Sequence, residues 1–262
     1  MSVETTSNPI ADNAGRVRPA GLPAHAVTVV VPCFNEEALV PALARACANL
    51  ARLLEGRYAL DFLFVDDGST DSTCAELSRA VGGSPSHAIV RHDRNRGIAA
   101  AIMTGVRHAR SPIVCSIDAD CTYDPAQLAE MIPLLVEGVD VVTASPYHPL
   151  GRVRGVPPWR LALSRTASRL YRCVTRQRLF TYTSCFRVYR RSAVADLELD
   201  HDDFVGIAEI LWKLDARGAR IVECPAVLQS RTGTRSKMKL LATIAGHGRL
   251  LARAAWTRLT GG

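Results

Sequence analysis

Between residues 27 and 144 the chain alternates short apolar runs with longer segments of helical periodicity, and this alternation restricts the fold more than any other feature. The run 27–31 predicts a buried strand, and in the segment 36–54 apolar residues recur every three or four positions, as in a helix. The order then repeats, with strands predicted at 60–65, 88–91, 113–117 and 139–144 and helices at 71–81, 96–109 and 125–137. This alternation predicts an α/β fold with a mostly parallel sheet and helices on both faces.

After residue 150 the pattern changes. We expect helices at 159–174 and 204–217, a strand at 184–189, and a short strand at 221–228 that Pro225 interrupts. The length of 262 residues allows one large domain. The sequence therefore predicts a disordered tail (1–25), a main α/β domain (26–240) and a C-terminal amphipathic helix (241–262).

The net charge of +7 is concentrated in the second half of the chain. No Asp or Glu occurs from Val141 to Ala195, a stretch that holds eleven arginines, and none follows Glu223. Such a block favours a polyanionic partner, namely phosphates, a membrane surface or nucleic acid, over the alternative of a solvated basic face. The basic helices 159–174 and 240–256 fit either a protein that lies on an anionic membrane or helices that simply pack on the sheet.

The eight cysteines form no C-x-x-C pair and no cluster with zinc spacing. Residues 1–24 are polar and do not resemble a signal peptide. No apolar run reaches the roughly 18–20 residues that a membrane span needs. We therefore expect a cytoplasmic protein without a transmembrane span. Such a protein could attach peripherally to the inner face of the membrane.

Carboxylates follow three of the predicted strands. Glu36 and Glu37 come after the first, Asp66 and Asp67 after the second, and the Asp118-Ala119-Asp120 motif after the fourth. The carboxyl ends of parallel strands meet at one edge of a sheet, where such folds bind ligands. Clustered acids need compensation, and a hard cation accepts one or two carboxylates together with substrate phosphates. The pattern predicts Mg²⁺ or Mn²⁺ bound by Asp118 and Asp120 and bridging a diphosphate.

Each motif alone has a simpler interpretation. An Asp-x-Asp triplet also occurs as a turn or a helix cap, Asp67-Gly68-Ser69 also suits a plain turn, and Asn35 also suits a cap for the helix that follows it. Their order at successive strand ends favours a functional site.

Several segments together resemble the inverting, GT-A-fold family 2 glycosyltransferases. They are Val30–Glu37, Phe64–Asp71, Asn95-Arg96-Gly97 and Asp118-Ala119-Asp120. Tyr182–Arg190, and Glu223-Cys224-Pro225 with Arg231 and Ser236-Lys237, resemble the polyprenol-phosphate sugar transferases of that family. The resemblance covers roughly residues 27–240 and implies an enzyme that moves a sugar from a nucleotide-sugar, GDP-mannose or a UDP-sugar, to a polyprenyl phosphate.

The resemblance also implies roles for individual residues. Nucleotide contacts would come from Pro32, Asn35, Glu37 and Gly97, and Asp66 or Asp67 would contact the base. Asp118 would lie near the ribose and the metal, next to Ala119, and Asp120 would coordinate the metal. The phosphate oxygens of donor or acceptor would be held by Arg160, Arg231 and Lys237.

The sequence departs from the family pattern at two places. Ala144-Ser145-Pro146-Tyr147 stands where the branch often has Gly-Ser-Arg before a Tyr, and Cys185 stands where Gly is frequent. The donor sugar and the acceptor are therefore left open.

The expected mechanism is a single displacement with inversion. An ionised phosphate acceptor needs no general base, whereas a hydroxyl acceptor on a small molecule or glycan would need one. The candidates for such a base are His201, Asp202, Asp203 and Glu209, although Asp202 and Asp203 also suit helix caps and Glu209 could simply orient a basic residue.

Two other classes of protein fit the sequence less well. A non-catalytic nucleotide- or nucleic-acid-binding module would suit the basic charge, but the chain has no aromatic-rich platform and no DNA-binding motif, so we expect no nucleic acid partner. A dinucleotide oxidoreductase is disfavoured because no G-x-G-x-x-G turn follows the first strand.

Overall fold

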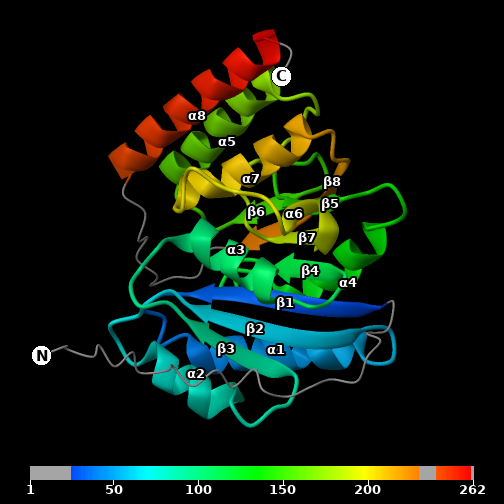
Figure 1. Cartoon of the computed structure of the whole chain (residues 1–262), viewed down its shortest axis with the longest axis vertical. Helices are drawn as coiled ribbons and strands as arrows, with labels where there is room; N and C mark the ends of the chain where they lie inside the picture. Colours follow the sequence, from blue (N-terminus) through cyan, green and yellow to red (C-terminus); the bar gives the residue numbers. More distant parts are fainter. Residues whose placement is uncertain (1–24, 230–239, 261–262) are drawn as a thin grey trace, which may run out of the picture.

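The computed structural model describes residues 25–229 and 240–260. Within these ranges, seven strands form a central sheet (Figure 1). In their order across the sheet they are β3 (His87–Arg91), β2 (Ala59–Asp66), β1 (Ala26–Cys33), β4 (Ile113–Ser116), β7 (Arg187–Arg190), β5 (Val141–Ser145) and β8 (Ile221–Pro225).

The sheet is mostly parallel, as the sequence predicts. Strands β3, β2, β1 and β4 run parallel to one another, and β5 runs parallel to β8. Strand β7 is antiparallel to both of its neighbours, β4 and β5. A small parallel sheet of β6 (Arg152–Arg154) and β9 (Val227–Gln229) lies beside the main one.

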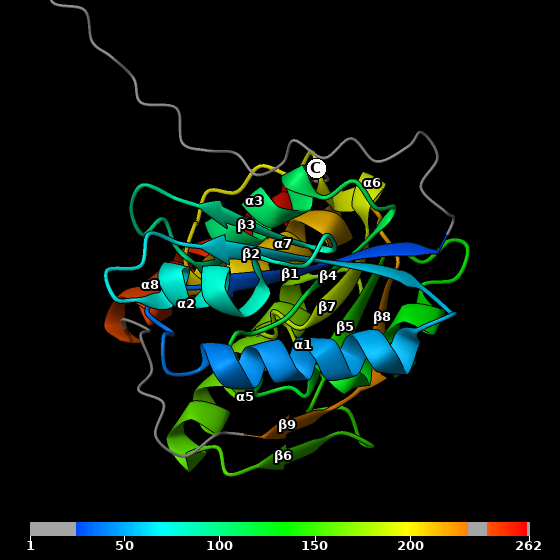
Figure 2. The ribbon, with the colours of Figure 1, turned by 90° about the horizontal axis from the view of Figure 1, so that it is seen from below.

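Helices cover both faces of the sheet (Figure 2). One face packs against α1 (Val40–Leu54), α2 (Thr73–Val81) and the short α4 (Leu128–Met131), which lies between the 3₁₀ turns Pro125–Gln127 and Ile132–Leu134. The other face packs against α3 (Ile98–His108), α6 (Arg191–Val194) and α7 (Phe204–Ala216). Because strand side chains alternate, Val29 of β1 lies in the first core and Val30 in the second.

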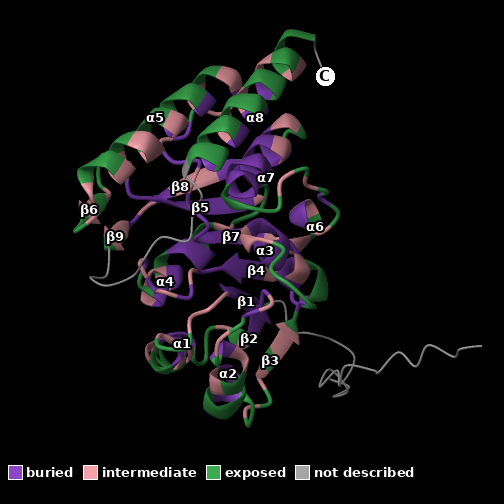
Figure 3. Ribbon diagram, turned by 90° about the vertical axis from the view of Figure 1, so that its left-hand side faces the viewer, coloured by how far each residue is buried: buried purple, intermediate pink, exposed green. Residues whose placement is uncertain are grey.

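Two long helices, α5 (Pro158–Val174) and α8 (Leu240–Thr260), form an outer layer and lie side by side in Figures 1 and 3. Helix α8 packs on both α5 and α7. The Tyr171 hydroxyl and His247 Nδ1 are 2.8 Å apart, and Arg258 donates hydrogen bonds to the carbonyls of Cys173 and Thr175 at the end of α5. The expected C-terminal helix is therefore part of the packed fold. In the described part of the chain, no helix is both long enough and apolar enough to cross a bilayer.

Four expected elements differ from the structure. The helix expected from residue 36 begins at Val40, because residues 36–39 form a turn in which the N–H of Leu39 donates to the Glu36 carbonyl. The helix expected at 125–137 is broken into short turns, since Pro133 offers no backbone N–H. The strand expected from residue 184 begins at Arg187, and the segment 221–228 forms β8 and β9 in two different sheets. Apart from His25, the tail expected at 1–25 lies outside the described residues.

Candidate functional site

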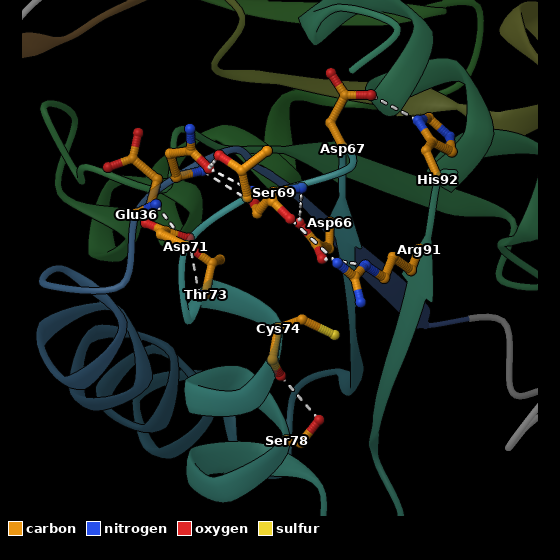
Figure 4. Close-up of polar contacts among 12 residues, drawn as sticks. Glu36, Asp66, Asp67, Ser69, Asp71, Thr73, Cys74, Ser78, Arg91 and His92 are labelled. Atoms are coloured by element: carbon orange, nitrogen blue, oxygen red, sulfur yellow. Dashed lines mark hydrogen bonds and ion pairs between the residues drawn. The ribbon is translucent and has the colours of Figure 1, made fainter. Parts of the chain in front are cut away.

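The loops after β1 and β2 are joined by hydrogen bonds (Figure 4). Asn35, in a left-handed conformation with φ of 52°, donates its backbone N–H to the Ser69 hydroxyl and accepts from the N–H of Thr70. The N–H of Glu36 donates to the Thr73 hydroxyl at 2.7 Å. We call this set of bonds the β1–β2 latch. It brings Asn35, predicted for the nucleotide pocket, beside the Asp66–Thr70 turn.

The latch continues at Glu37, whose Oε2 accepts the backbone N–H of Ser72 at 2.9 Å. Pro32, the other residue predicted for the pocket from this strand, lies within β1 and is paired in register with Val65. The structure therefore groups Pro32, Asn35 and Glu37 at the carboxyl edge of β1, as the sequence predicts.

Asp66 is fully buried at the end of β2. Its Oδ1 accepts the N–H of Ser69, and its Oδ2 lies 3.1 Å from Nε of Arg91 on β3. Arg91 also donates to the Ser69 carbonyl. The carboxylate is thereby neutralised by a cation and fixes the turn that carries Ser69.

Asp67 is also buried, and both of its oxygens are engaged by protein groups. Its Oδ1 lies 2.6 Å from His92 Nδ1 and accepts the N–H of Arg96, while its Oδ2 accepts the N–H of Gly97. The other ring nitrogen of His92 lies 3.0 Å from the Thr104 hydroxyl of α3. In this arrangement Asp67 holds the loop between β3 and α3, and its contact with a nucleotide base stays a prediction.

Gly97 is placed where only glycine fits. It has φ of 111°, and a Cβ atom there would collide with the carbonyl oxygen of Asp202. That oxygen accepts the N–H groups of Ala99 and Ala100 in the first turn of α3. Gly97 thus joins the predicted nucleotide loop to the segment that precedes α7.

Asp118, Ala119 and Asp120 follow β4 on the same edge of the sheet. The N–H of Ile117 donates to the Val30 carbonyl, so the motif starts level with the end of β1. Ala119 is buried in the core, and Cys121 turns the chain with φ of 49°. The Asp120 Oδ1 accepts both the N–H and the hydroxyl of Thr122 at 2.9 Å, which fixes this carboxylate at the edge of the site.

The charge of Asp118 is poorly compensated. Burial, together with the negative charges of Asp120 and Glu36, raises the pKa of Asp118 to about 7, although a hydrogen bond from Cys185 opposes that shift. The Cys185 Sγ lies 2.7 Å from Asp118 Oδ1. A carboxylate with this environment fits a divalent cation, which would supply the missing positive charge.

Among the described residues, no group of three or more His, Cys, Asp and Glu side chains is assembled to hold a metal. A cation at this edge would therefore take Asp118 and Asp120 and complete its shell with phosphate oxygens and water, as Mg²⁺ commonly does. This is the mode of binding that the sequence predicts.

The segment that precedes β7 is held by two charged side chains, Glu223 and Arg187, whose structural partners the sequence did not indicate. Glu223 accepts the N–H groups of Phe180 and Thr181. Arg187 is completely buried and donates to the carbonyls of Tyr182 and Ile207. Arg187 belongs to the Tyr182–Arg190 segment quoted above for its resemblance to the family, but its charge alone does not distinguish it from the exposed arginines of the acid-free stretch.

The four candidates for a general base lie around the start of α7. Asp203 caps this helix, because its Oδ1 accepts the N–H of Val205. Glu209 is buried and accepts from the N–H of Asp200 and from the N–H of His201, and it lies 2.7 Å from Lys213 Nζ. The capping interpretation is confirmed for Asp203, and Glu209 orients a basic residue and the loop before α7.

The structure gives little information on the three residues predicted to hold phosphate oxygens. Arg160 lies in the first turn of α5, with its guanidinium carbon 5.2 Å from the ring centroid of Trp159. Arg231 and Lys237 lie outside the described residues. All three roles stay predictions.

A mostly parallel sheet that carries the buried, poorly compensated Asp118 beside Asp120 at its carboxyl edge fits the binding of a cation together with phosphates. The family model Glycosyl transferase family 2 matches residues 28–198, and the chain belongs to that family. It is therefore an enzyme that transfers a sugar.

Three bacterial proteins illustrate what the chain is similar to. The polyprenol monophosphomannose synthase of Mycolicibacterium smegmatis is 29% identical over 224 residues, which cover 82% of each chain. An undecaprenyl-phosphate 4-deoxy-4-formamido-L-arabinose transferase of Klebsiella pneumoniae is 30% identical over 85% of this chain, which spans 65% of that relative. An uncharacterised glycosyltransferase of Mycobacterium bovis is 35% identical over 81% of this chain and 89% of its own length.

Solved structures confirm the fold. Glucosyl-3-phosphoglycerate synthase of Mycobacterium tuberculosis, in complex with Mn²⁺, uridine diphosphate and phosphoglyceric acid, superposes with a TM-score of 0.64. It covers 89% of this chain and 78% of its own, at 17% sequence identity. The expected GT-A fold is therefore confirmed.

Proposed function

We propose that this enzyme transfers a sugar from a nucleotide-sugar to a polyprenyl phosphate, with inversion at the anomeric carbon and with Mg²⁺ or Mn²⁺ held by Asp118 and Asp120. The observation that carries the proposal is the carboxylate pair at the end of β4, where burial and the negative charges of Asp120 and Glu36 raise the pKa of Asp118 to about 7. The names of the relatives support the choice of a polyprenyl phosphate acceptor.

The donor would bind across the carboxyl ends of β1, β2 and β4. The β1–β2 latch fixes Asn35 before any ligand arrives, and Asp67 fixes the loop that carries Gly97. The diphosphate would then lie next to Asp118 and Asp120. A divalent cation held by these two carboxylates would neutralise the charge that develops on the leaving diphosphate.

The chemical step needs no proton transfer. A phosphate monoester is largely ionised at neutral pH, so one of its oxygens can attack the anomeric carbon directly. The bond between that carbon and the diphosphate oxygen breaks, and its electron pair leaves with the nucleoside diphosphate. The task of the protein is therefore to position the two phosphates and to compensate their charge.

A hydroxyl acceptor is the second candidate, and one observation favours it. Asp202 is exposed and lines an open, polar depression with Asp93, Arg94, Asn95 and Arg96, so a carboxylate is available beside the loop that leads to Gly97. A hydroxyl acceptor would use Asp202 as the base. In that case Asp202→Asn would abolish transfer, whereas with a phosphate acceptor it would leave transfer nearly unchanged.

A calorimetric titration tests the donor site. The full chain is titrated with GDP, UDP and dTDP, each with and without Mn²⁺ or Mg²⁺. We expect one nucleotide to bind only with metal and Asp120→Ala to abolish this binding. The matched control is Asp124→Ala, which removes an exposed carboxylate four residues away. Failure of all three nucleotides to bind with either metal would refute the proposal.

The acceptor is then tested with the matching nucleotide-sugar and undecaprenyl phosphate in detergent. The expected product is a glycosyl phosphate of inverted anomeric configuration, which NMR of the purified lipid identifies. If the sugar is transferred to water or to a simple hydroxyl compound but not to the lipid phosphate, the result would favour a hydroxyl acceptor.

A further inference from the structure

Exposed apolar side chains gather on the outer layer of the molecule. Among the described residues, six of the eleven exposed large hydrophobic side chains belong to α5 and α8. They are Trp159 and Leu170 of α5 and Leu241, Ile244, Trp256 and Leu259 of α8. Leu241, Leu259 and Trp256 are among the most exposed, at 83%, 84% and 69%. Such a concentration marks an interaction surface.

These side chains lie on one side of each helix. In α8 the opposite side, which includes Gly246, Leu250 and Ala254, is buried against α7 and its neighbours. In α5 the buried side includes Ser168 and Tyr171. Figure 3 shows both helices with their exposed residues turned outward from the sheet. We call the exposed sides of α5 and α8 together the outer face.

The outer face is basic and contains no acid. Neither 158–174 nor 240–260 includes an Asp or a Glu. Exposed arginines stand between the apolar residues, at Arg165 and Arg169 of α5 and at Arg249, Arg253 and Arg258 of α8. Two of these arginines also hold α8 in place, since Arg253 bonds to Asp200 and Arg258 to the end of α5.

We propose that the outer face lies on the surface of a lipid bilayer that contains anionic lipids. The apolar side chains and the two tryptophans would enter the boundary between headgroups and acyl chains, and the arginines would bind lipid phosphates. This combination of exposed apolar residues, arginines and tryptophan is that of interfacial helices.

The charges favour a bilayer over a second copy of the chain. A symmetric dimer through this face would bring acid-free, arginine-rich helices against each other, with no carboxylate in them to compensate. Nucleic acid would satisfy the arginines but would leave the apolar side chains of Leu241, Ile244 and Leu259 without a suitable partner.

The position of α8 gives this surface an orientation. Its first turns lie on the same side of the molecule as the carboxyl ends of β1 and β2 (Figure 1). Helix α8 is also joined to the loop before α7 through Arg253 and Asp200. A protein resting on its outer face would therefore have the carboxyl ends of β1 and β2 pointing to the side of the molecule on which α8 begins. The inference is separate from the proposed function, although it suits a lipid acceptor.

Binding to vesicles tests the proposal. The full chain is sedimented with vesicles of phosphatidylcholine alone and with vesicles of equimolar phosphatidylcholine and phosphatidylglycerol, without nucleotide or polyprenyl phosphate. We expect binding to the anionic vesicles that weakens as salt rises. Arg169→Glu with Arg249→Glu should weaken the partition by at least about tenfold, and Trp256→Glu with Leu259→Glu should abolish it.

Matched controls change the same residue types elsewhere. Leu53→Glu removes an exposed apolar side chain of α1, and Arg45→Glu with Arg52→Glu reverses two exposed arginines of the same helix. These variants should bind as the wild type does. Circular dichroism and the metal-dependent nucleotide titration show whether each variant is folded.

Tryptophan fluorescence gives a second readout on the unaltered chain. Trp159 and Trp256 are exposed and Trp212 is 6% exposed, so brominated lipids should quench only part of the emission. In the variant with Trp159→Phe and Trp256→Phe, quenching should disappear.

Three results would overturn the proposal: no binding of the full chain to anionic vesicles, equal loss in the control variants, or a wild-type dimer that Trp256→Glu converts to monomers without any lipid binding. The vesicles hold no acceptor, so a failure to bind them would not count against the transferase proposal. Conversely, a failure of metal-dependent nucleotide binding would not count against the membrane-binding proposal.

Discussion

The ends of β2 and β4 both present a pair of carboxylates at the same edge of the sheet, but their environments are opposite. At the end of β2, Asp66 is paired with Arg91, and Asp67 is surrounded by His92 and two backbone N–H groups. At the end of β4, Asp118 faces the negative charges of Asp120 and Glu36, and its hydrogen-bond donor among the described residues is the weak thiol of Cys185.

The carboxylates at the end of β2 therefore stabilise the fold, whereas those at the end of β4 are suited to binding a ligand. A buried acid with filled hydrogen bonds stabilises the fold, whereas acids that repel one another cost stability until a cation arrives. Substitution at the two strand ends should therefore produce opposite results, with stability lost at β2 and function lost at β4.

The largest expected effect is at Asp120. Asp120→Asn should lower the rate of sugar transfer by about 10³-fold or more, because the cation would lose an anionic ligand. Thermal stability should stay unchanged or rise, since the repulsion with Asp118 is removed. Rates and melting temperatures are compared with those of Asp124→Asn, and an unfolded Asp120→Asn protein would break the comparison.

The next effect is at Asp67. Asp67→Ala leaves two backbone N–H groups and His92 without their acceptor, so the free energy of unfolding should fall by about 3 kcal/mol. Urea denaturation measures this loss. A stable variant that no longer binds nucleotide would instead make Asp67 a ligand and remove the distinction between the two strand ends.

A somewhat smaller loss is expected at Gly97. In Gly97→Ala the new methyl group meets the Asp202 carbonyl, and the backbone keeps an unfavourable φ, so stability should fall by about 2 kcal/mol. Gly138→Ala is the matched control, because it also has positive φ but has open space around it. Equal losses in the two variants would show that backbone strain alone, and not the contact with Asp202, explains the effect.

The smallest effect is expected at Cys185. Cys185→Ala removes the thiol donor to Asp118, and a weak donor of this kind should change the rate of transfer by only about threefold. Cys185→Ser, which keeps a donor, should retain the wild-type rate. A loss as large as that of Asp120→Asn would mean that Cys185 belongs to the metal site itself.

Much of the fold was accessible from the sequence, because buried parallel strands are continuous apolar runs and their helices keep a regular period. A strand near β7 was also expected, but its antiparallel direction and its place in the sheet were not. Strand β7 has four residues, and its place between β4 and β5 depends on pairing across distant parts of the chain. The break at Pro133 was visible in the sequence, but the regular apolar spacing around it favoured one helix.

At the site, the sequence located the carboxylates but not their partners. Asp67 and Asp118 look alike as residues after a strand, and only the return of β3 beside β2 brings His92 to Asp67. The contact between Cys185 and Asp118 joins residues 67 positions apart. Arg187 shows the limit of reasoning from charge, since this arginine of the basic stretch is entirely buried.

The β1–β2 latch has a thermodynamic consequence. Loops that are already tied together by Asn35, Glu36 and Glu37 have little conformational freedom left to lose when a nucleotide arrives. Because such preorganised loops lose less conformational entropy on binding, more of the free energy of each nucleotide contact contributes to affinity. Loosening the latch by Asn35→Ala should therefore make nucleotide binding entropically more costly, even though the metal carboxylates are untouched.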